Sequence, residues 1–221
     1  MNIQIWGDSW GVPNRTETKY NNFTAEKHTE FRLRGLGHSV LNLSVNGGHN
    51  LQSMLQSSKY PRSNVIIWFH TCLCRDFVKF DYQGAGKFDP DKVIEETADK
   101  VYRYAAQCAD AQLIVIEGHN EVHRPAFERH LPNAVVIPTI IKTITKKTYP
   151  YSQWFSMSSM HRGVDMLNES TWTLPTVTNE IDKWNKRLDI VRDYQQYFPD
   201  GCHPGDYGHE IIVDSVLKAI R

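Results

Sequence analysis

The sequence predicts an α/β protein, a three-layer sandwich in which helices cover both faces of a central parallel sheet of about five strands. Two observations lead to this fold class. Short apolar runs alternate with amphipathic segments along most of the chain. In addition, the run Val65–Phe69 is apolar at every position, as expected for a strand that is covered on both faces. A strand–helix–strand order with right-handed crossovers then makes the strands parallel.

Four more strands are expected around the central run. Residues 3–6 end abruptly at Gly7, residues 39–45 alternate apolar and polar side chains, and the last two runs are 113–116 and 134–137. Each run is short, rich in β-branched residues and followed by a turn signal such as Gly or Pro. The first strand therefore ends where Asp8 and Ser9 enter a turn.

The helices are expected between these strands, at positions where an apolar stripe recurs every three to four residues. The clearest begins at Asp89-Pro90 and runs to about Ala109, with Pro90 in the first turn. Others are expected from Thr24, as the cap, to the glycines at 35 and 37, and around residues 50–52, 178–197 and 207–220. Residues 145–176 show no period, and we expect an irregular insertion near the active face.

Bulk composition indicates one globular domain, because 221 residues with 40% hydrophobic content suffice for one sizeable core and leave little for a second. Lys plus Arg equals Asp plus Glu at 25 each, so no net charge draws the protein to nucleic acid or to an anionic membrane. No secretory signal and no bilayer-spanning run is visible. We therefore expect a protein that is cytoplasmic in the producing cell or virion-associated, of unspecified oligomeric state.

Ser9 is the candidate nucleophile, because it follows the first strand at the end where open α/β sheets carry their chemistry. A serine hydroxyl needs a base to take its proton. Asp200-Gly201-Cys202-His203 supplies one near the other end of the chain, since an aspartate three residues before a histidine can orient its ring in a loop. Asp8, beside Ser9, is expected instead to brace the turn by accepting backbone amides.

These motifs resemble the SGNH or GDSL hydrolase family, whose first block is Gly-Asp-Ser near the amino terminus and whose last is Asp-x-x-His near the carboxyl terminus. Here they stand as Gly7-Asp8-Ser9 and Asp200-Gly201-Cys202-His203, followed by a His-Pro-x-x-x-Gly-His run that ends at His209. The resemblance implies a flavodoxin-like fold and a serine esterase with a Ser9–His203–Asp200 triad. It also implies that no cofactor is needed. His209 is expected to cap or pack at the last helix.

The oxyanion hole is the part of the resemblance that this chain departs from. The Ser9 amide is one candidate donor, and in the family a glycine at the position of Gly47 donates a second, although Gly47 would serve equally well as the turn that leaves the strand. The family's third block, Gly-x-Asn-Asp, is replaced by a stretch with Cys72 at the asparagine position, and a thiol is a poor donor. Thr71, His70 or Asn120 takes this role, or the hole has two donors at a loss of about 3 kcal/mol.

The substrate expected from the resemblance is a small-acyl ester, with an O-acetyl group on carbohydrate in first place because the 145–176 insertion is rich in aromatic and hydroxyl side chains. Trp10, Trp154, Phe155 and Trp172 could stack on sugar rings or simply fill the core. The four scattered cysteines do not provide zinc-type spacing, so no metal site is expected.

Two other classes remain open from the sequence. One is a catalytically weak or inactive binding or virion-associated protein that kept the fold and lost the third block. A His-Thr pair in this place, followed by Arg75-Asp76, is similar to hydrolase-like proteins carried by bacterial viruses, which implies a viral origin. The other is a phosphatase-like or nucleotide-binding domain, which ranks lower because the chain has no glycine-rich phosphate loop.

Overall fold

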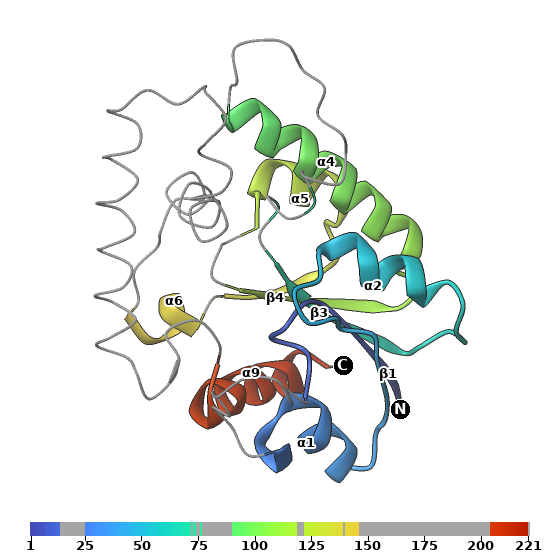
Figure 1. Ribbon diagram of the computed structural model, residues 1–221, viewed down its shortest axis with the longest axis vertical. Coiled ribbons are helices and arrows are strands. Elements are labelled where there is room, and N and C mark those ends of the chain that lie inside the picture. Colours follow the sequence, from blue (N-terminus) through green and yellow to red (C-terminus); the bar gives the residue numbers. More distant parts are fainter. Residues whose placement is uncertain are drawn as a thin grey trace.

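The computed structural model describes residues 1–13, 25–71, 73, 76, 90–118, 122–138, 140–145 and 204–220. Within this part of the chain a five-stranded, wholly parallel sheet is flanked by helices on both faces (Figure 1). The strands are β1 (Asn2–Trp6), β2 (Ser39–Asn42), β3 (Val65–His70), β4 (Gln112–Glu117) and β5 (Val135–Ile137). The predicted α/β fold class, with its parallel sheet of about five strands, is confirmed.

The strand order is β2-β1-β3-β4-β5. Because β1 lies between β2 and β3, the chain leaves β1 toward one edge and returns to build the rest of the sheet on the other side. In flavodoxin-like sheets this reversal opens a crevice at the carboxyl ends of β1 and β3, where ligands bind. Ser9 follows β1 and Thr71 follows β3, so both stand at this switch point.

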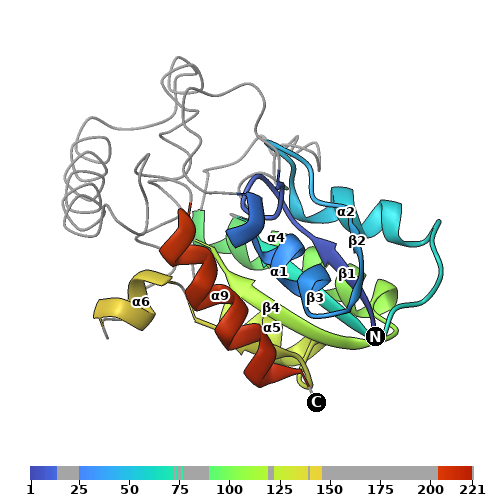
Figure 2. The same ribbon diagram turned by 90° about the horizontal axis from the view of Figure 1, so that it is seen from below.

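Among the described residues, two helices cover one face of the sheet and three cover the other. Figure 2 shows α1 (Thr29–Gly35) and α9 (Asp206–Ala219) lying together on one face. On the opposite face are α2 (Asn50–Ser57), α4 (Pro90–Cys108) and α5 (Arg124–His130). A short helix α6 (Ile140–Thr145) follows β5, and the 3-10 turn η1 (Ala25–Lys27) precedes α1.

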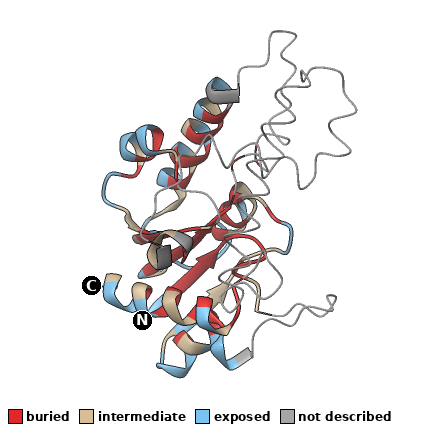
Figure 3. Ribbon diagram, turned by 90° about the vertical axis from the view of Figure 1, so that its left-hand side faces the viewer, coloured by how far each residue is buried: buried red, intermediate tan, exposed pale blue. Residues whose placement is uncertain are grey.

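The core has two layers, because successive side chains of a strand point to opposite faces of the sheet. Ile67 packs with Leu33 and Val216 on the α1–α9 side, whereas Trp68 packs with Met54 and Tyr102 on the other. Accordingly, β3 is buried along its whole length and β4 from Leu113 to Glu117, as Figure 3 shows in red. Each such large apolar side chain contributes roughly 2 kcal/mol by leaving water.

Several element boundaries differ from the predicted ones. The first helix begins at Thr29 and not at Thr24, because His28 has an extended backbone and its Nδ1 accepts the Glu30 amide at 3.2 Å. The second strand ends at Asn42, although the Val45 amide still bonds the Gly7 carbonyl at 3.1 Å. The expected helices at 90–109 and 207–220 are confirmed as α4 and α9, and the one at 50–52 as α2.

The helices α5 and α6 were not anticipated from the sequence, since each is only about two turns long. The expected helix at 178–197 lies outside the described residues, as does the expected irregular insertion from residue 146 on. In the described part of the chain, no helix has both the length and the apolar composition needed to cross a bilayer.

Candidate active site

Ser9 lies in a tight turn directly after β1, with only 4% of its surface exposed. The turn is closed by the Gly11 amide, which donates to the Asp8 carbonyl at 3.0 Å. Trp10, the next residue, packs into the core on the α1–α9 side, so the core alternative holds for this aromatic residue. The sequence therefore places a serine on a rigid turn at the switch point of the sheet.

Gly7 makes this turn possible. Its φ of +147° lies in a region that side chains rarely adopt, and a Cβ built on it would come within 2.6 Å of the Phe69 Cβ on β3. Both backbone groups of Gly7 are also fixed by α2, because the Ser53 hydroxyl accepts from its amide at 3.0 Å and donates to its carbonyl at 3.1 Å. The approach to Ser9 is thus held by the neighbouring strand and by a helix.

Asp8 braces the turn, as predicted. Its Oδ1 accepts the Trp10 amide at 3.0 Å, and its Oδ2 accepts the Thr71 hydroxyl at 2.8 Å. The second bond crosses from the end of β1 to the end of β3 and joins the two turns that flank the switch point. Asp8 therefore acts on the geometry around Ser9.

The amide, the carbonyl and the hydroxyl of Thr71 each form a hydrogen bond. Its amide donates to Asn50 Oδ1 at 3.0 Å, its carbonyl accepts from Asn50 Nδ2 at 3.1 Å, and its hydroxyl donates to Asp8. Asn50 Oδ1 also accepts the Trp68 indole N–H at 3.1 Å. Because a hydroxyl has a single hydrogen, Thr71 cannot donate to a substrate oxyanion while this bond to Asp8 lasts.

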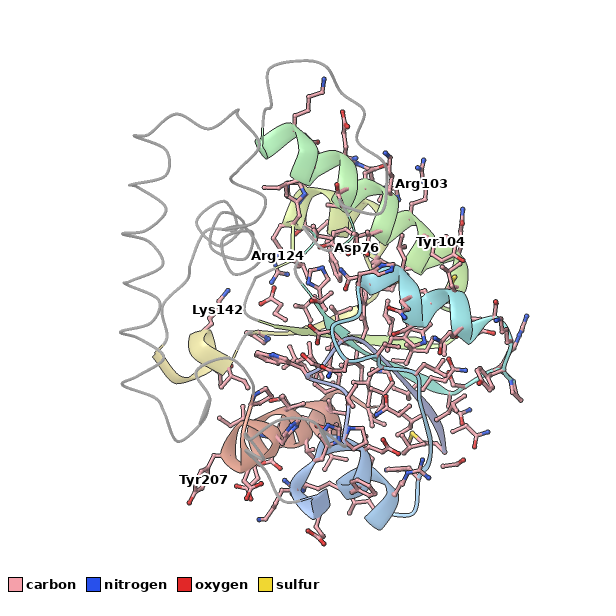
Figure 4. All side chains as sticks on the ribbon, in the orientation of Figure 1. Asp76, Arg103, Tyr104, Arg124, Lys142 and Tyr207 are labelled. Atoms are coloured by element: carbon pink, nitrogen blue, oxygen red, sulfur yellow. The ribbon has the colours of Figure 1, made fainter. Side chains whose placement is uncertain are left out.

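Asp76 anchors the same network from behind. It is fully buried and accepts from Asn50 Nδ2 at 2.6 Å, from the Leu51 amide at 3.2 Å and from His49 Nδ1 at 3.1 Å. Figure 4 shows it between α4 and the start of α2. Asp76 therefore acts as a cap, since it satisfies an amide in the first turn of α2.

The pairing of His49 with Asp76 had no signal in the sequence, because the two residues are 27 positions apart.

His70, the last residue of β3, turns its ring into the layer beneath α4. Its Nε2 meets the Tyr102 hydroxyl at 3.0 Å, and that oxygen accepts the His123 amide at 3.1 Å. The Tyr102 oxygen thus meets an amide hydrogen and a ring nitrogen, and the direction of its bond to Nε2 is set by the tautomer of His70. Burial lowers the pKa of His70 to about 3, which keeps the ring neutral at physiological pH. Within the described residues its Nδ1 has no hydrogen-bond partner.

Tyr102 remains a phenol, because burial raises its pKa. Glu117, at the end of β4, is paired in register with His70 and is fully buried. One of its carboxylate oxygens accepts from Arg124 and from the Val122 amide, each at 3.0 Å. Buried polar side chains thus end both β3 and β4, a feature that the apolar pattern of these strands did not reveal.

Gly47 lies in the turn between β2 and α2, at an exposed position with a φ of +66°. A Cβ there would meet no other atom of the described chain within 4 Å, so the positive φ and not crowding calls for glycine. The turn interpretation of Gly47 is therefore supported, and donation of its amide to an oxyanion stays a prediction.

Asp200, His203 and Asn120 lie outside the described residues, so the triad and the substitute donor stay predictions. His209, which is described, is buried in α9, its Nδ1 3.2 Å from the Thr29 hydroxyl and its ring 4.5 Å from that of His28. The expectation that His209 packs at the last helix is confirmed. No group of three or more metal-ligating side chains comes together in the described part of the chain.

No protein-family model matches the chain, and no curated protein matches it. Among solved structures it is similar to the psychrotrophic esterase EstA from Pseudoalteromonas sp., at 12% identity over 99% of this chain and 96% of that one, with a TM-score of 0.48. TesA matches at 13% identity, 100% and 98% coverage and a TM-score of 0.46. A putative GDSL-like lipase from Parabacteroides merdae matches at 13% identity, 99% and 94% coverage and a TM-score of 0.44. At these scores nothing about the function of the chain follows from the likeness.

Proposed function

We propose that the protein is a serine esterase that hydrolyses small-acyl esters. The observation that carries this proposal is the placement of Ser9 at the switch point of a parallel sheet, on a turn fixed by Gly7 and Asp8. Asp-x-x-His at positions 200–203 provides the matching base and orienting acid in the sequence.

In the proposed reaction the Ser9 oxygen attacks the acyl carbon while His203 takes its proton and Asp200 holds the imidazole tautomer. The bond from the acyl carbon to the alcohol oxygen then breaks, and His203 returns the proton to the leaving alcohol. Water, activated by the same histidine, releases the acid and restores Ser9. No cofactor takes part in these steps.

The oxyanion donors that we propose are the amides of Ser9 and Gly47. For a third donor, Asn120 and His70 remain as candidates, since the Thr71 amide and hydroxyl are both engaged by neighbours. Each donor of this kind is worth about 3 kcal/mol of transition-state stabilisation. A substrate with an O-acetyl group on carbohydrate is proposed because of the aromatic and hydroxyl-rich stretch at 145–176.

The test is turnover of p-nitrophenyl acetate by the purified protein together with labelling by a serine-directed fluorophosphonate. We expect turnover and labelling that Ser9→Ala abolishes. The matched control is Ser58→Ala, because Ser58 is exposed and its hydroxyl only bonds the Leu55 carbonyl in the same helix end. Labelling that persists in Ser9→Ala, or turnover that is equal in the two variants, would refute the nucleophile.

A second candidate function is a non-catalytic binding or virion-associated protein on the same fold. It is favoured by one observation, the engagement of both Thr71 donors directly beside Cys72, the position at which the resembled family has its asparagine. Absence of Ser9-dependent turnover in a folded protein would select this alternative.

A further inference from the structure

A second carboxylate–imidazole couple, His49 with Asp76, lies at the same edge of the sheet as Ser9. The two side chains meet at 3.1 Å between Nδ1 and Oδ1, and the carboxylate is completely buried whereas 17% of the imidazole is exposed. Neither His49 nor Asp76 has a role in the proposed reaction. This pattern, a buried acid on Nδ1 of a partly exposed imidazole, orients the ring and leaves Nε2 for a contact with another molecule.

Capping of α2 does not account for His49. It occupies the N-cap position, yet its side chain makes no capping hydrogen bond. Asp76 serves that purpose instead by accepting the Leu51 amide at 3.2 Å. The imidazole therefore bonds the residue that caps the helix, and its own Nε2 has no hydrogen-bond partner among the described residues.

A continuous series of contacts connects His49 to the nucleophile. Asp76 bonds Asn50, Asn50 bonds both backbone groups of Thr71, and Thr71 bonds Asp8, which precedes Ser9. His49 also follows the turn of Gly47 by two residues. Because each contact is a hydrogen bond between buried or half-buried groups, His49 is held in a fixed relation to the Ser9 turn.

The chemistry of the couple specifies what it binds. A carboxylate only accepts, so Nδ1 carries a hydrogen, and in the neutral form of the imidazole Nε2 presents a lone pair. A lone pair suits a hydroxyl donor and does not suit a carbonyl oxygen or an oxyanion. In an ester of a sugar or another polyol, the donors available to this lone pair are the free hydroxyl groups of the alcohol part.

We propose that His49, oriented by Asp76, binds a hydroxyl group on the alcohol portion of the ester and so selects polyhydroxylated substrates. This inference rests on the proposed function and adds to its carbohydrate substrate the side chain that recognises the free hydroxyl groups of the alcohol part. The corresponding hydrogen bond is worth about a factor of ten in affinity.

The test compares two ligands that differ only in hydroxyl groups, a methyl mono-O-acetyl glycoside and the same compound with its remaining hydroxyls methylated. Dissociation constants are measured by calorimetry in Ser9→Ala protein, so that the result does not depend on catalysis. We expect a preference of about tenfold for the hydroxylated ester, which disappears in His49→Ala. His49→Gln, whose amide oxygen accepts a hydrogen bond, should restore part of it.

His130→Ala is the matched control. His130 is 18% exposed and its Nε2 bonds Asp99 at 2.7 Å, but it lies on α5 and takes no part in the network around Thr71. This variant should keep the full preference. An unchanged preference in His49→Ala, or an equal loss of affinity for both ligands, would overturn the proposal.

Turnover of the same two ligands by protein with Ser9 intact separates the two proposals. Hydrolysis without any His49-dependent preference would refute the proposed hydroxyl-binding role of His49 and support the esterase activity. A preference in binding without Ser9-dependent hydrolysis would refute the esterase activity and support the role of His49.

Discussion

Thr71 shows at the scale of single residues how the chain builds a site from polar groups that satisfy one another. All three of its hydrogen-bonding groups are used, two by Asn50 and one by Asp8. Such a residue is a positioning residue, because it fixes the ends of β1 and β3 and keeps none of its own donors for a substrate. Its removal should therefore affect geometry and stability together.

Thr71→Val should lower the free energy of unfolding by about 2 kcal/mol, because the buried Asp8 carboxylate loses a hydrogen-bond donor of the charge-assisted kind. Urea titration at pH 7 measures this loss. Thr71→Ser, which keeps the hydroxyl, should recover most of the stability. Equal stability of the Val and Ser variants would show that the bond to Asp8 contributes nothing.

His70 makes stability depend on pH in a defined direction. Its folded-state pKa, lowered by burial to about 3, lies below the ordinary value of 6.5, so protons bind the unfolded chain first. The contribution of neutral His70 to the free energy of unfolding is fully present above pH 6.5. It is lost at about 1.4 kcal/mol per pH unit as the pH falls toward 3. Between pH 7 and pH 5 the loss from this residue is about 2 kcal/mol.

His70→Gln, which retains an acceptor for Tyr102 but has no titrating ring, provides the comparison. The free energy of unfolding of this variant should fall by about 2 kcal/mol less than that of the parent between pH 7 and pH 5. Parallel pH profiles for the two proteins would contradict a buried neutral His70.

Residues were predictable from the sequence where a local pattern exists, and not where the partner is distant. Ser9 and Asp8 follow a strand, and His209 lies in the first turn of a helix, so their surroundings could be anticipated. His49 and Asp76 are 27 positions apart, and His70 and Tyr102 are 32 apart. No spacing rule joins such pairs, because they meet only when α2, β3 and α4 have packed.

At the scale of elements, β1 and its turn depend on the close approach of Gly7 to β3. Gly7→Ala would place a methyl group 2.6 Å from the Phe69 Cβ at a φ of +147°. We expect a loss of at least about 3 kcal/mol in the free energy of unfolding, from strain and overpacking combined. Denaturant unfolding followed by circular dichroism measures it.

Gly37→Ala is the control for Gly7→Ala, because Gly37 has a φ of +84° and no atom within 4 Å of an added Cβ. Gly37→Ala therefore has the conformational penalty, which amounts to about 1 kcal/mol, and no clash. Similar losses in the two variants would mean that the contact with Phe69 is relieved at little cost.

Elements were predictable in proportion to their length and regularity. The nineteen-residue α4 and the apolar strands β3 and β4 have strong periodic or continuous patterns. By contrast, α5 spans seven residues and α6 six, too few for a stripe to stand out. The start of α1 was misplaced because His28 caps the helix through its ring nitrogen, and histidine is not among the usual capping residues.

At the scale of the whole molecule, the parallel character of the sheet could be predicted, whereas the strand order β2-β1-β3-β4-β5 could not. Alternation of strands and helices fixes the handedness of the crossovers, but the side on which each crossover places the next strand depends on tertiary packing. The switch point that brings Ser9 beside Thr71 is thus a property of the folded chain.

The balance of charges predicts how the protein behaves in solution. With 25 basic and 25 acidic side chains and an isoelectric point near 7.1, the molecule has almost no net charge at neutral pH. Solubility in low-salt buffer should therefore be lowest near pH 7 and higher at pH 9, where repulsion between copies increases. Light scattering over this range checks it, and a solubility that does not change with pH would contradict the charge argument.

The pairing of α1 with α9 has a consequence for how the protein is made. Lys27 bonds Glu210 at 2.7 Å and Thr29 meets His209 at 3.2 Å, so α9 is fastened onto the early part of the chain. A ribosome synthesises α9 after all five strands, and until then Ile3, Ile5 and Ile67 lack part of their cover. The nascent chain thus presents an apolar sheet face until α9 has been made, and such a face is the kind of surface that chaperones recognise.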